Sequence, residues 1–197
     1  MSNILLDEQF WTTRYLNNLT AWDTGRVTDP IKQYLDQLEN KKLKILIPGA
    51  GNGHEAIYGF KKGFRNLHIL DISVLPLRQF QRSCPDFPEN QMHHMDFFLH
   101  EGQYDLIIEQ TFFCALHPER RMDYCKKMNE LLKPSGKLVG VLFAKNFEHD
   151  GPPFGGDIEE YRNLFSREFD IQKLEICYNS ITPRKGNEVF ISLQKNQ

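Results

Sequence analysis

Apolar blocks that have the length of strands alternate along this chain with segments whose apolar residues follow helical spacing. The strand-like blocks are residues 44–48, 67–71, 91–96, 104–109 and 137–144, of which 91–96 is the weakest. The helical segments are residues 54–62, 73–82 and 118–132, with two more that begin at Asp29 and Asp157. Two last strands are predicted where Leu174, Ile176 and Tyr178, and then Val189, Ile191 and Leu193, alternate with other residues. This order predicts an α/β fold: a doubly wound, mainly parallel sheet with helices on both faces.

Residues at the ends of the helical segments support these boundaries. Pro30 stands where the first helical position of its segment is expected, and Gly63 follows the segment that it ends. Ser73 can cap the next helix, and Asp157 with Glu160 has the spacing of a capping box. No repeat or low-complexity segment divides the 197 residues, so we expect a single domain that spans residues 1–197.

Composition narrows the possible partners and compartments. The chain has 24 basic and 26 acidic side chains, so it carries no overall cationic field that would attract nucleic acid or an anionic membrane. Neither a secretory signal nor an apolar run long enough to cross a membrane is recognisable, which favours a cytoplasmic protein. The four cysteines are irregularly spaced and are expected to be reduced, mostly buried thiols. The seven histidines lack metal-ligand spacing, so we expect no metal site.

The first strand-like block leads into a glycine-rich loop, Gly49-Ala50-Gly51-Asn52-Gly53. Glycines allow a tight turn and a close approach of the backbone to a ligand, and the helix that follows offers free N–H groups. Ligands of such sheets bind beyond the carboxyl ends of the strands. Because His54 replaces the third glycine of the dinucleotide pattern, a nicotinamide-dependent oxidoreductase is disfavoured. The other interpretation of the loop is a tight turn with only a structural role.

Acidic and polar residues follow the next strands. Asp71 ends the block at 67–71, where a carboxylate would accept both ribose hydroxyls of a nucleoside, although it could also cap a helix. Asp96 is placed to accept from an adenine amino group while Phe97 covers the ring; its alternative is a solvated loop acid. Glu109 and Gln110 end the fourth strand and are expected beneath the reacting end of the ligand.

These motifs together resemble the seven-stranded methyltransferases that use S-adenosylmethionine. The glycine loop, Asp71, Asp96 and residues 131–138 (LLKPSGKL) carry that resemblance. More narrowly, the chain is similar to the thiopurine methyltransferase superfamily, and especially to its plant halide/thiol methyltransferase branch, through residues 22–25 (WDTG), 47–51 (IPGAG), 112–116 (FFCAL), 151–153 (GPP) and 182–186 (TPRKG). The similarity is ordered along the chain from about Phe10 to about Phe190.

The resemblance implies a Rossmann-like sheet of seven strands with an antiparallel last strand. It also implies that residues 1–25 form an N-terminal lid over S-adenosylmethionine, which leaves as S-adenosylhomocysteine. Aromatic faces suit a sulfonium cation, although these aromatic residues could instead pack in the core. The cofactor-binding candidates, from the resemblance and from the motifs above, are Trp11, Tyr15, Trp22, Gly49, Gly51, Gly53, Asp71, Ile72, Asp96, Phe97, Glu109 and Gln110.

Several positions depart from the plant branch and bear on the methyl acceptor. Tyr15 and Gln110 stand where that branch tends to have tryptophan and tyrosine, and Phe143 where it tends to have a tyrosine beside the substrate. Arg121 matches a basic position near the substrate mouth of thiopurine enzymes, or is an exposed helix arginine. Phe143 and Arg121 are therefore the substrate-side candidates, and no catalytic residue is assigned.

The expected function is methyl transfer from S-adenosylmethionine to a small soft nucleophile, such as a thiol, sulfide, thiocyanate or halide, by direct in-line displacement. Such an acceptor needs alignment but no general base if it arrives ionised. Thiopurine-type methylation of an aromatic thiol, methylation of oxygen or nitrogen in a small metabolite, and cofactor binding without turnover are the alternatives. A small molecule or anion is the expected partner, with no nucleic acid and no membrane, and a monomer is favoured.

Overall fold

The structure is a computed structural model that describes residues 5–196, and its centre is a seven-stranded sheet in the order β3-β2-β1-β4-β5-β7-β6. The strands are β1 (Ile45–Pro48), β2 (Leu67–Asp71), β3 (Met92–His94), β4 (Tyr104–Gln110), β5 (Leu132–Phe143), β6 (Phe169–Ile176) and β7 (Glu188–Lys195). The helices are α1 (Glu8–Leu16), α2 (Asp29–Asp36), α3 (His54–Lys61), α4 (Val74–Ser83), α5 (Arg121–Leu131) and α6 (Ile158–Phe165).

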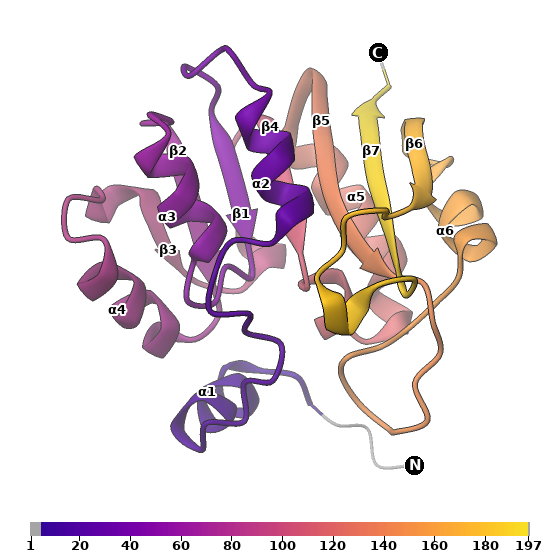
Figure 1. The fold of residues 1–197 in the computed structure, drawn as a ribbon, viewed down its shortest axis with the longest axis horizontal. Coiled ribbons are helices and arrows are strands. Elements are labelled where there is room, and N and C mark those ends of the chain that lie inside the picture. Colours follow the sequence, from indigo (N-terminus) through magenta and orange to yellow (C-terminus); the bar gives the residue numbers. More distant parts are fainter. Residues whose placement is uncertain (1–4, 197) are drawn as a thin grey trace.

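Strands β1 to β5 pair in parallel, whereas β7 lies antiparallel between β5 and β6. The prediction of a mainly parallel sheet with an antiparallel last strand is confirmed. The strand order reverses between β1 and β4, and in an open α/β sheet a ligand binds beyond the carboxyl ends of the strands at such a point. Figure 1 shows α1 beyond that edge, apart from the layers of helices that cover the sheet.

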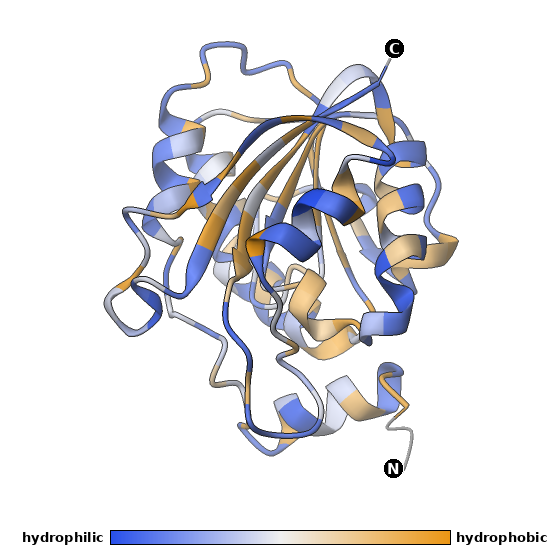
Figure 2. Ribbon diagram, turned by 90° about the vertical axis from the view of Figure 1, so that its right-hand side faces the viewer, coloured by the Kyte–Doolittle hydropathy of each residue, from blue (hydrophilic) through white to orange (hydrophobic). Residues whose placement is uncertain are grey.

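The sheet separates two hydrophobic cores, which explains why its central strands are apolar without interruption. In β1, Ile45 and Ile47 face the core beneath α2, α3 and α4, while Leu46 faces the core with α5 and α6. In β4, Leu106 and Ile107 divide in the same way. The sheet is the apolar layer between amphipathic helices in Figure 2. Successive side chains of a strand point to opposite faces, so a strand covered by helices on both faces must be apolar at every position.

Helix boundaries follow the capping residues that the sequence indicates. Pro30 lies in the first turn of α2, the hydroxyl of Ser73 accepts from the N–H of Leu75, and the carboxylate of Asp157 accepts from the N–H of Glu160. Gly63 follows the end of α3 with a φ of +94°. Cys84, Cys114, Cys125 and Cys177 are all buried and reduced, as predicted.

Two segments begin differently from the sequence prediction, the strand predicted at 91–96 is shorter (Met92–His94), and one helix was not predicted. The segment 118–132 is a short 3-10 turn, Pro118–Arg120, followed by α5, because the chain bends at Arg120 before it enters the helix. Strand β5 begins at Leu132 and not at residue 137, since Leu132 already pairs with Tyr104 across a bulge. Helix α1 was not predicted, because its apolar residues follow no amphipathic pattern and none of its side chains is buried.

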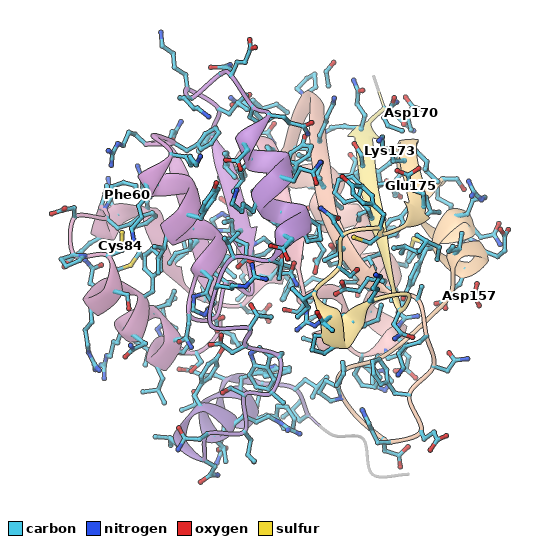
Figure 3. All side chains as sticks on the ribbon, viewed as in Figure 1. Phe60, Cys84, Asp157, Asp170, Lys173 and Glu175 are labelled. Atoms are coloured by element: carbon cyan, nitrogen blue, oxygen red, sulfur yellow. The ribbon has the colours of Figure 1, made fainter. Side chains whose placement is uncertain are left out.

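The alternation predicted for residues 174–178 does not bury one face. Ile176 is 51% exposed and Tyr178, which lies beyond the end of β6, is 73% exposed. The reason is that β6 is the edge strand of the sheet, and the hydroxyl of Tyr178 donates to the side chain of Gln33 at 2.7 Å. The same edge carries the charged residues Asp170, Lys173 and Glu175 (Figure 3), which disfavour pairing with another strand.

Candidate functional site

A cavity of about 670 Å³ lies at the carboxyl ends of the parallel strands, between the edge of the sheet and α1. Its size and its mixture of apolar walls with a few polar groups are typical of small-molecule sites. Ten of the twelve cofactor candidates line it: Trp11, Tyr15, Trp22, Gly49, Gly51, Asp71, Ile72, Asp96, Phe97 and Gln110. Gly53 and Glu109 do not, although both lie next to residues that do.

The glycine loop after β1 contains three glycines with left-handed φ angles, but for different reasons. A side chain at Gly49 would collide with the ring of Phe112, and one at Gly53 with the ring of Phe80, both at 2.3 Å. At Gly51 an added Cβ would meet only the hydroxyl of Tyr15, at 3.0 Å. Gly51 is therefore the position that keeps the cavity open, while Gly53 allows α3 to pack against α4.

Asp71 ends β2 and holds two loops of the cavity together. One carboxylate oxygen accepts from the N–H of Gly51 and the other from the N–H of Ser73, both at 2.9 Å. The side chain is buried, and this burial raises the pKa of the carboxyl to about 6. Asp71 lines the cavity, where its contact with a ribose stays a prediction, and its bond to Ser73 shows that it supports the start of α4.

Asp96 and Phe97 form the wall that follows β3. The carboxylate of Asp96 accepts from the N–H of Phe98 at 2.9 Å, which fixes the direction of the turn. The ring of Phe97 is buried and lies edge-on to the ring of Phe112, with 5.0 Å between the ring centres. An adenine-sized group placed here would have an acidic acceptor at its edge and an aromatic ring beside it.

The N-terminal segment covers the cavity with an aromatic cluster. The ring of Trp22 is edge-on to the rings of Trp11 and Tyr15, at 5.6 Å and 5.8 Å. These three side chains are partly buried, and none of them belongs to either hydrophobic core of the described residues. At α1, the hydroxyl of Thr12 lies 2.8 Å from that of Ser73, so this helix contacts the start of α4.

Asp23 fastens the same segment to the glycine loop. Its carboxylate accepts from the side-chain amide of Asn52 at 2.5 Å and lies 2.7 Å from Nε2 of His54. The hydrogen bond with His54 lowers the pKa of Asp23 and raises the pKa of the histidine. The carbonyl of Trp22 accepts from Nη2 of Arg184 at 2.8 Å. The segment is thus tied to α3 and to the turn before β7.

The two substrate-side candidates, Phe143 and Arg121, lie in different surroundings. Phe143, at the end of β5, lines the cavity as expected. Arg121 does not: it lies at the start of α5, pairs with Glu160 and donates to the carbonyl of Gly155. It is 6% exposed, so it is not an exposed helix arginine either. Its neighbour Arg120 lines the cavity instead. Arg120 is the last residue of the 3-10 turn before the helix, whereas Arg121 is the first residue of α5.

Arg184 is a functional candidate that the sequence analysis did not single out. It lies within the 182–186 motif, is buried, and places its guanidinium 5.4 Å from the ring centre of Phe143 on the cavity wall. Nη1 lies 3.4 Å from the carboxylate of Glu188. The signal that could have found it is a basic residue in a short motif directly before the last predicted strand.

Further wall residues come from the loop after β4 and from the segment after β5. They are mostly apolar or aromatic and include Phe112, Cys114, Ala115, Leu116, His117, Pro152 and Pro153. Burial raises the pKa of the Cys114 thiol, so this cysteine is not poised as a nucleophile. Within the part of the chain that the structure describes, no cluster of three or more His, Cys, Asp or Glu side chains is arranged to bind a metal.

The family Thiopurine S-methyltransferase matches residues 6–195, which is nearly the whole chain. The chain belongs to this family. Thiocyanate methyltransferase 1 from Brassica oleracea and its namesake from Arabidopsis thaliana are each 30% identical to this methyltransferase over 93% of its chain and 83% of their own. A thiopurine S-methyltransferase from Vibrio parahaemolyticus is 24% identical over 81% of this chain and 82% of its own.

Solved structures with the same fold include methyltransferases with bound S-adenosylhomocysteine. A 1,6-didemethyltoxoflavin-N1-methyltransferase from Burkholderia thailandensis superimposes with a TM-score of 0.78 at 16% identity, over 96% of this chain and 87% of its own. A magnesium protoporphyrin IX methyltransferase from Synechocystis gives 0.71 at 15% identity, over 96% and 97%. The chain is an S-adenosylmethionine-dependent methyltransferase. Its cavity fits that cofactor. Gly51 leaves room there, and the carboxylates of Asp71 and Asp96 and the aromatic cluster line the walls around that space.

Proposed function

We propose that the methyltransferase transfers the methyl group to a small soft nucleophile, such as a thiolate, sulfide, thiocyanate or halide, by in-line displacement. The observation that carries this proposal is the guanidinium of Arg184, which is buried, is paired with Glu188 on one side and faces the cavity among mostly aromatic and apolar neighbours. A cation in such a place attracts a polarisable anion and keeps it ionised. The names of the plant thiocyanate methyltransferases support the same acceptor class.

Strand order divides the cavity into two halves. Asp71 and Asp96 follow β2 and β3 on one side of the switch point, whereas Phe143 and Arg184 lie at β5 and before β7 on the other. We assign the first half to the nucleoside: Asp71 to the ribose hydroxyls and Asp96 to the adenine amino group. The second half is then the acceptor half, with the methyl group between the two near Gly51, Gln110 and the aromatic cluster.

When bound, S-adenosylmethionine supplies a methyl group on a sulfonium; the acceptor's lone pair forms the new bond to carbon, and the pair of the broken C–S bond returns to sulfur to give S-adenosylhomocysteine. The protein's residues provide alignment and exclude water. Trp11, Tyr15 and Trp22 cover the opening, and Arg184 orients the acceptor. An acceptor that arrives ionised needs no general base, and a well-aligned pair gains effective molarities of about 10⁵ to 10⁸ M.

Methylation of an aromatic thiol is the second candidate, because Phe112, Leu116 and Phe143 offer apolar surface beside Arg184. Both candidates share the anionic sulfur and differ in how much apolar surface the acceptor covers. Within residues 5–196 no helix is both long and apolar enough to cross a membrane.

A panel of acceptors tests the proposal. The enzyme is incubated with S-adenosylmethionine and iodide, thiocyanate, hydrosulfide or an aromatic thiol, and both the methylated product and S-adenosylhomocysteine are measured. We expect turnover with at least one of these soft anions. Activity confined to oxygen or nitrogen acceptors, or binding of cofactor with no turnover, would contradict the proposed function.

Two variants of Arg184 test the assignment of the acceptor half. Arg184→Met should lower kcat/KM for the anionic acceptors by about tenfold or more, since the charge-assisted contact is lost. Arg184→Lys should recover part of the activity, and Arg162→Met, an exposed change on α6, should have no effect. Affinity for S-adenosylhomocysteine, measured by calorimetry, should stay the same in Arg162→Met and fall moderately in Arg184→Met, because the bond to the carbonyl of Trp22 is lost. The deciding readout is therefore the ratio of kcat/KM for anionic and neutral acceptors. An equal loss for anionic and neutral acceptors would remove Arg184 from this role.

A further inference from the structure

Glu109, at the end of β4, is a buried carboxylate that does not reach the cavity. Its exposed fraction is 0%. Oε1 accepts from the N–H groups of Phe112 and Phe113, at 2.8 Å and 3.0 Å, and Oε2 accepts from the hydroxyl of Tyr124 at 2.7 Å. No Lys, Arg or His among residues 5–196 forms an ion pair with it. The carboxylate therefore holds its place through neutral donors alone.

The segment that Glu109 holds has a conformation that it would not adopt unaided. Thr111 has a φ of +59°, which a β-branched residue rarely adopts. Such a residue persists only where the surrounding contacts fix it. The two N–H groups that Glu109 binds follow Thr111 directly, so the carboxylate closes a tight loop around it.

This segment forms part of the wall of the acceptor half. Phe112 packs against the glycine loop and faces the cavity, and Cys114 and Leu116 follow on the same wall. The carbonyl of Cys114 accepts from the N–H of Phe154 at 2.7 Å, so the segment that contains Pro152 is attached to it as well. A shift of the Phe112 and Phe113 amides would move the whole wall.

We propose that Glu109 is a positioning residue for the methyl acceptor, which in its ionised form holds the wall of residues 111–117 in place through the amides of Phe112 and Phe113. The proposal rests on the proposed function in one respect: it assigns this wall to the acceptor.

The surroundings of Glu109 make this role dependent on pH. Burial raises the pKa of its carboxyl to about 7. The ionisable groups that face it are Tyr124 from α5 and Cys114 from the wall itself, whose own pKa values burial also raises. On β5 the residue paired with Glu109 is Gly140, which has no side chain to place a charge beside it.

Protonation weakens each contact of the carboxylate. A neutral carboxyl oxygen is a poorer acceptor for the two amides than an ionised one. If Oε2 carries the proton and donates to Tyr124, the tyrosine hydroxyl loses its acceptor. The wall should therefore be held more firmly above pH 7 than below it.

Glu109→Gln separates this role from a purely structural one. The glutamine keeps an Oε1 that can accept from both amides, and its NH₂ can donate to the oxygen of Tyr124, so the fold is preserved. It cannot ionise. Asp105→Asn, at the opposite end of the same strand, is the matched control, because its carboxylate contacts Lys44 and Lys133 and no wall residue.

The first measurement needs no acceptor. Amide hydrogen exchange of Phe112 and Phe113 is followed by NMR at pH 6 and pH 8, and each rate is divided by the rate in Glu109→Gln at the same pH, which cancels the intrinsic pH dependence. We expect protection in the wild type to rise by about tenfold relative to the variant over this interval, because the carboxyl changes from mostly protonated to mostly ionised. A ratio that does not change with pH would overturn the proposal.

The second measurement uses thiocyanate, which stays anionic throughout this pH range. In the wild type, KM for thiocyanate should fall as the pH rises through 7, with little change in kcat. In Glu109→Gln, KM should be higher at pH 8 and independent of pH. Tyr124→Phe removes a donor that favours the ionised form, so it should move the inflection to higher pH, whereas Asp105→Asn should keep the wild-type profile.

The two measurements distinguish the failure of this proposal from that of the proposed function. Equal pH profiles of KM in the wild type and in Glu109→Gln would refute the positioning role. If none of the soft anions in the acceptor panel is methylated, the proposed function fails, and the exchange rates alone still decide whether Glu109 holds the wall.

Discussion

Asp71 carries out two tasks with one carboxyl group. It binds the backbone of Gly51 and of Ser73, and it faces the cavity where we place the ribose. Because both backbone contacts lie within the protein, replacement of Asp71 affects local order as well as ligand binding. A change that keeps the shape of the side chain is therefore more informative than its removal.

Asp71→Asn should weaken the binding of S-adenosylhomocysteine by about 1 to 3 kcal/mol, since the ribose hydroxyls lose a charged acceptor. Isothermal calorimetry measures this directly. Asp170→Asn, an exposed change on the edge strand β6, is the control and should bind like the wild type. Unchanged affinity in Asp71→Asn would remove this residue from the cofactor site.

Gly51→Val should abolish cofactor binding, because its Cβ branches would occupy the space beside Tyr15 and the residue would have to adopt a φ of +55°. Gly63→Val is a matched control: Gly63 also has a positive φ, but nothing lies within 4 Å of an added Cβ. It should lose stability and keep affinity for S-adenosylhomocysteine. If a folded Gly51→Val variant still binds the cofactor, the glycine loop is not its binding site.

At the scale of elements, residues 8–25 form a separate covering unit that is attached at a few points. The polar attachments of this unit are made by Glu8, Thr12, Asp23 and the carbonyl of Trp22. They reach the end of β3, the N-cap of α4, the start of α3 and the turn before β7. A segment held by so few contacts opens more readily than the core strands do. Its aromatic cluster can complete the cavity only while these contacts hold.

Limited proteolysis tests whether this unit is a lid. S-adenosylhomocysteine should protect residues 8–25 from cleavage, and Asp23→Asn should reduce that protection because the contact with His54 loses its charge. Deletion of residues 1–19 should leave a folded core that binds cofactor poorly and does not turn over. Equal protection with and without ligand would show instead that the segment is a fixed part of the structure.

The sequence predicted the elements whose local signals agree with their packing. Strands β1 and β2 and the glycine loop were predictable, because an apolar strand followed by glycines, and then a second apolar strand that ends in an acid, has few alternatives in an α/β protein. Arg121 was misplaced because its burial depends on Glu160, 39 residues away, which no local pattern reveals. Helix α1 was missed because it packs at the edge of the cavity and has no buried face.

Across the whole molecule, acid affects two sets of buried groups in opposite directions. His68, His93 and His100 lie together beside Tyr104, and burial lowers the pKa of each, to about 4 for His68 and His100. Their contribution to stability is complete above the unfolded-state pKa of about 6.5 and is lost as the pH falls toward 4. Burial raises the pKa of Asp71 and Glu109, so their ionisation lowers stability as the pH rises toward 7.

His100→Gln should therefore become more stable relative to the wild type as the pH falls from 7.5 to 4.5. After allowance for solvent screening, we expect a relative gain of about 1 to 3 kcal/mol in the free energy of unfolding. Urea denaturation at the two pH values measures it, and His117→Gln, which removes a half-exposed imidazole away from the three clustered histidines, is the control. A difference between His100→Gln and the wild type that does not vary with pH would contradict the expected titration.

On the proposed function, Arg184 would link the binding of an anionic acceptor to the closure of the covering segment, residues 8–25. The same guanidinium donates to the carbonyl of Trp22 and faces the acceptor half of the cavity. An anion that draws this guanidinium toward itself weakens its bond to Trp22, and a covering segment that closes tightly leaves fewer donors for the anion. By reciprocity, the two effects are equal in free energy. After methyl transfer the product is neutral, and the guanidinium would return to the carbonyl of Trp22. The covering segment would therefore be held more tightly after the reaction than while the charged acceptor is bound.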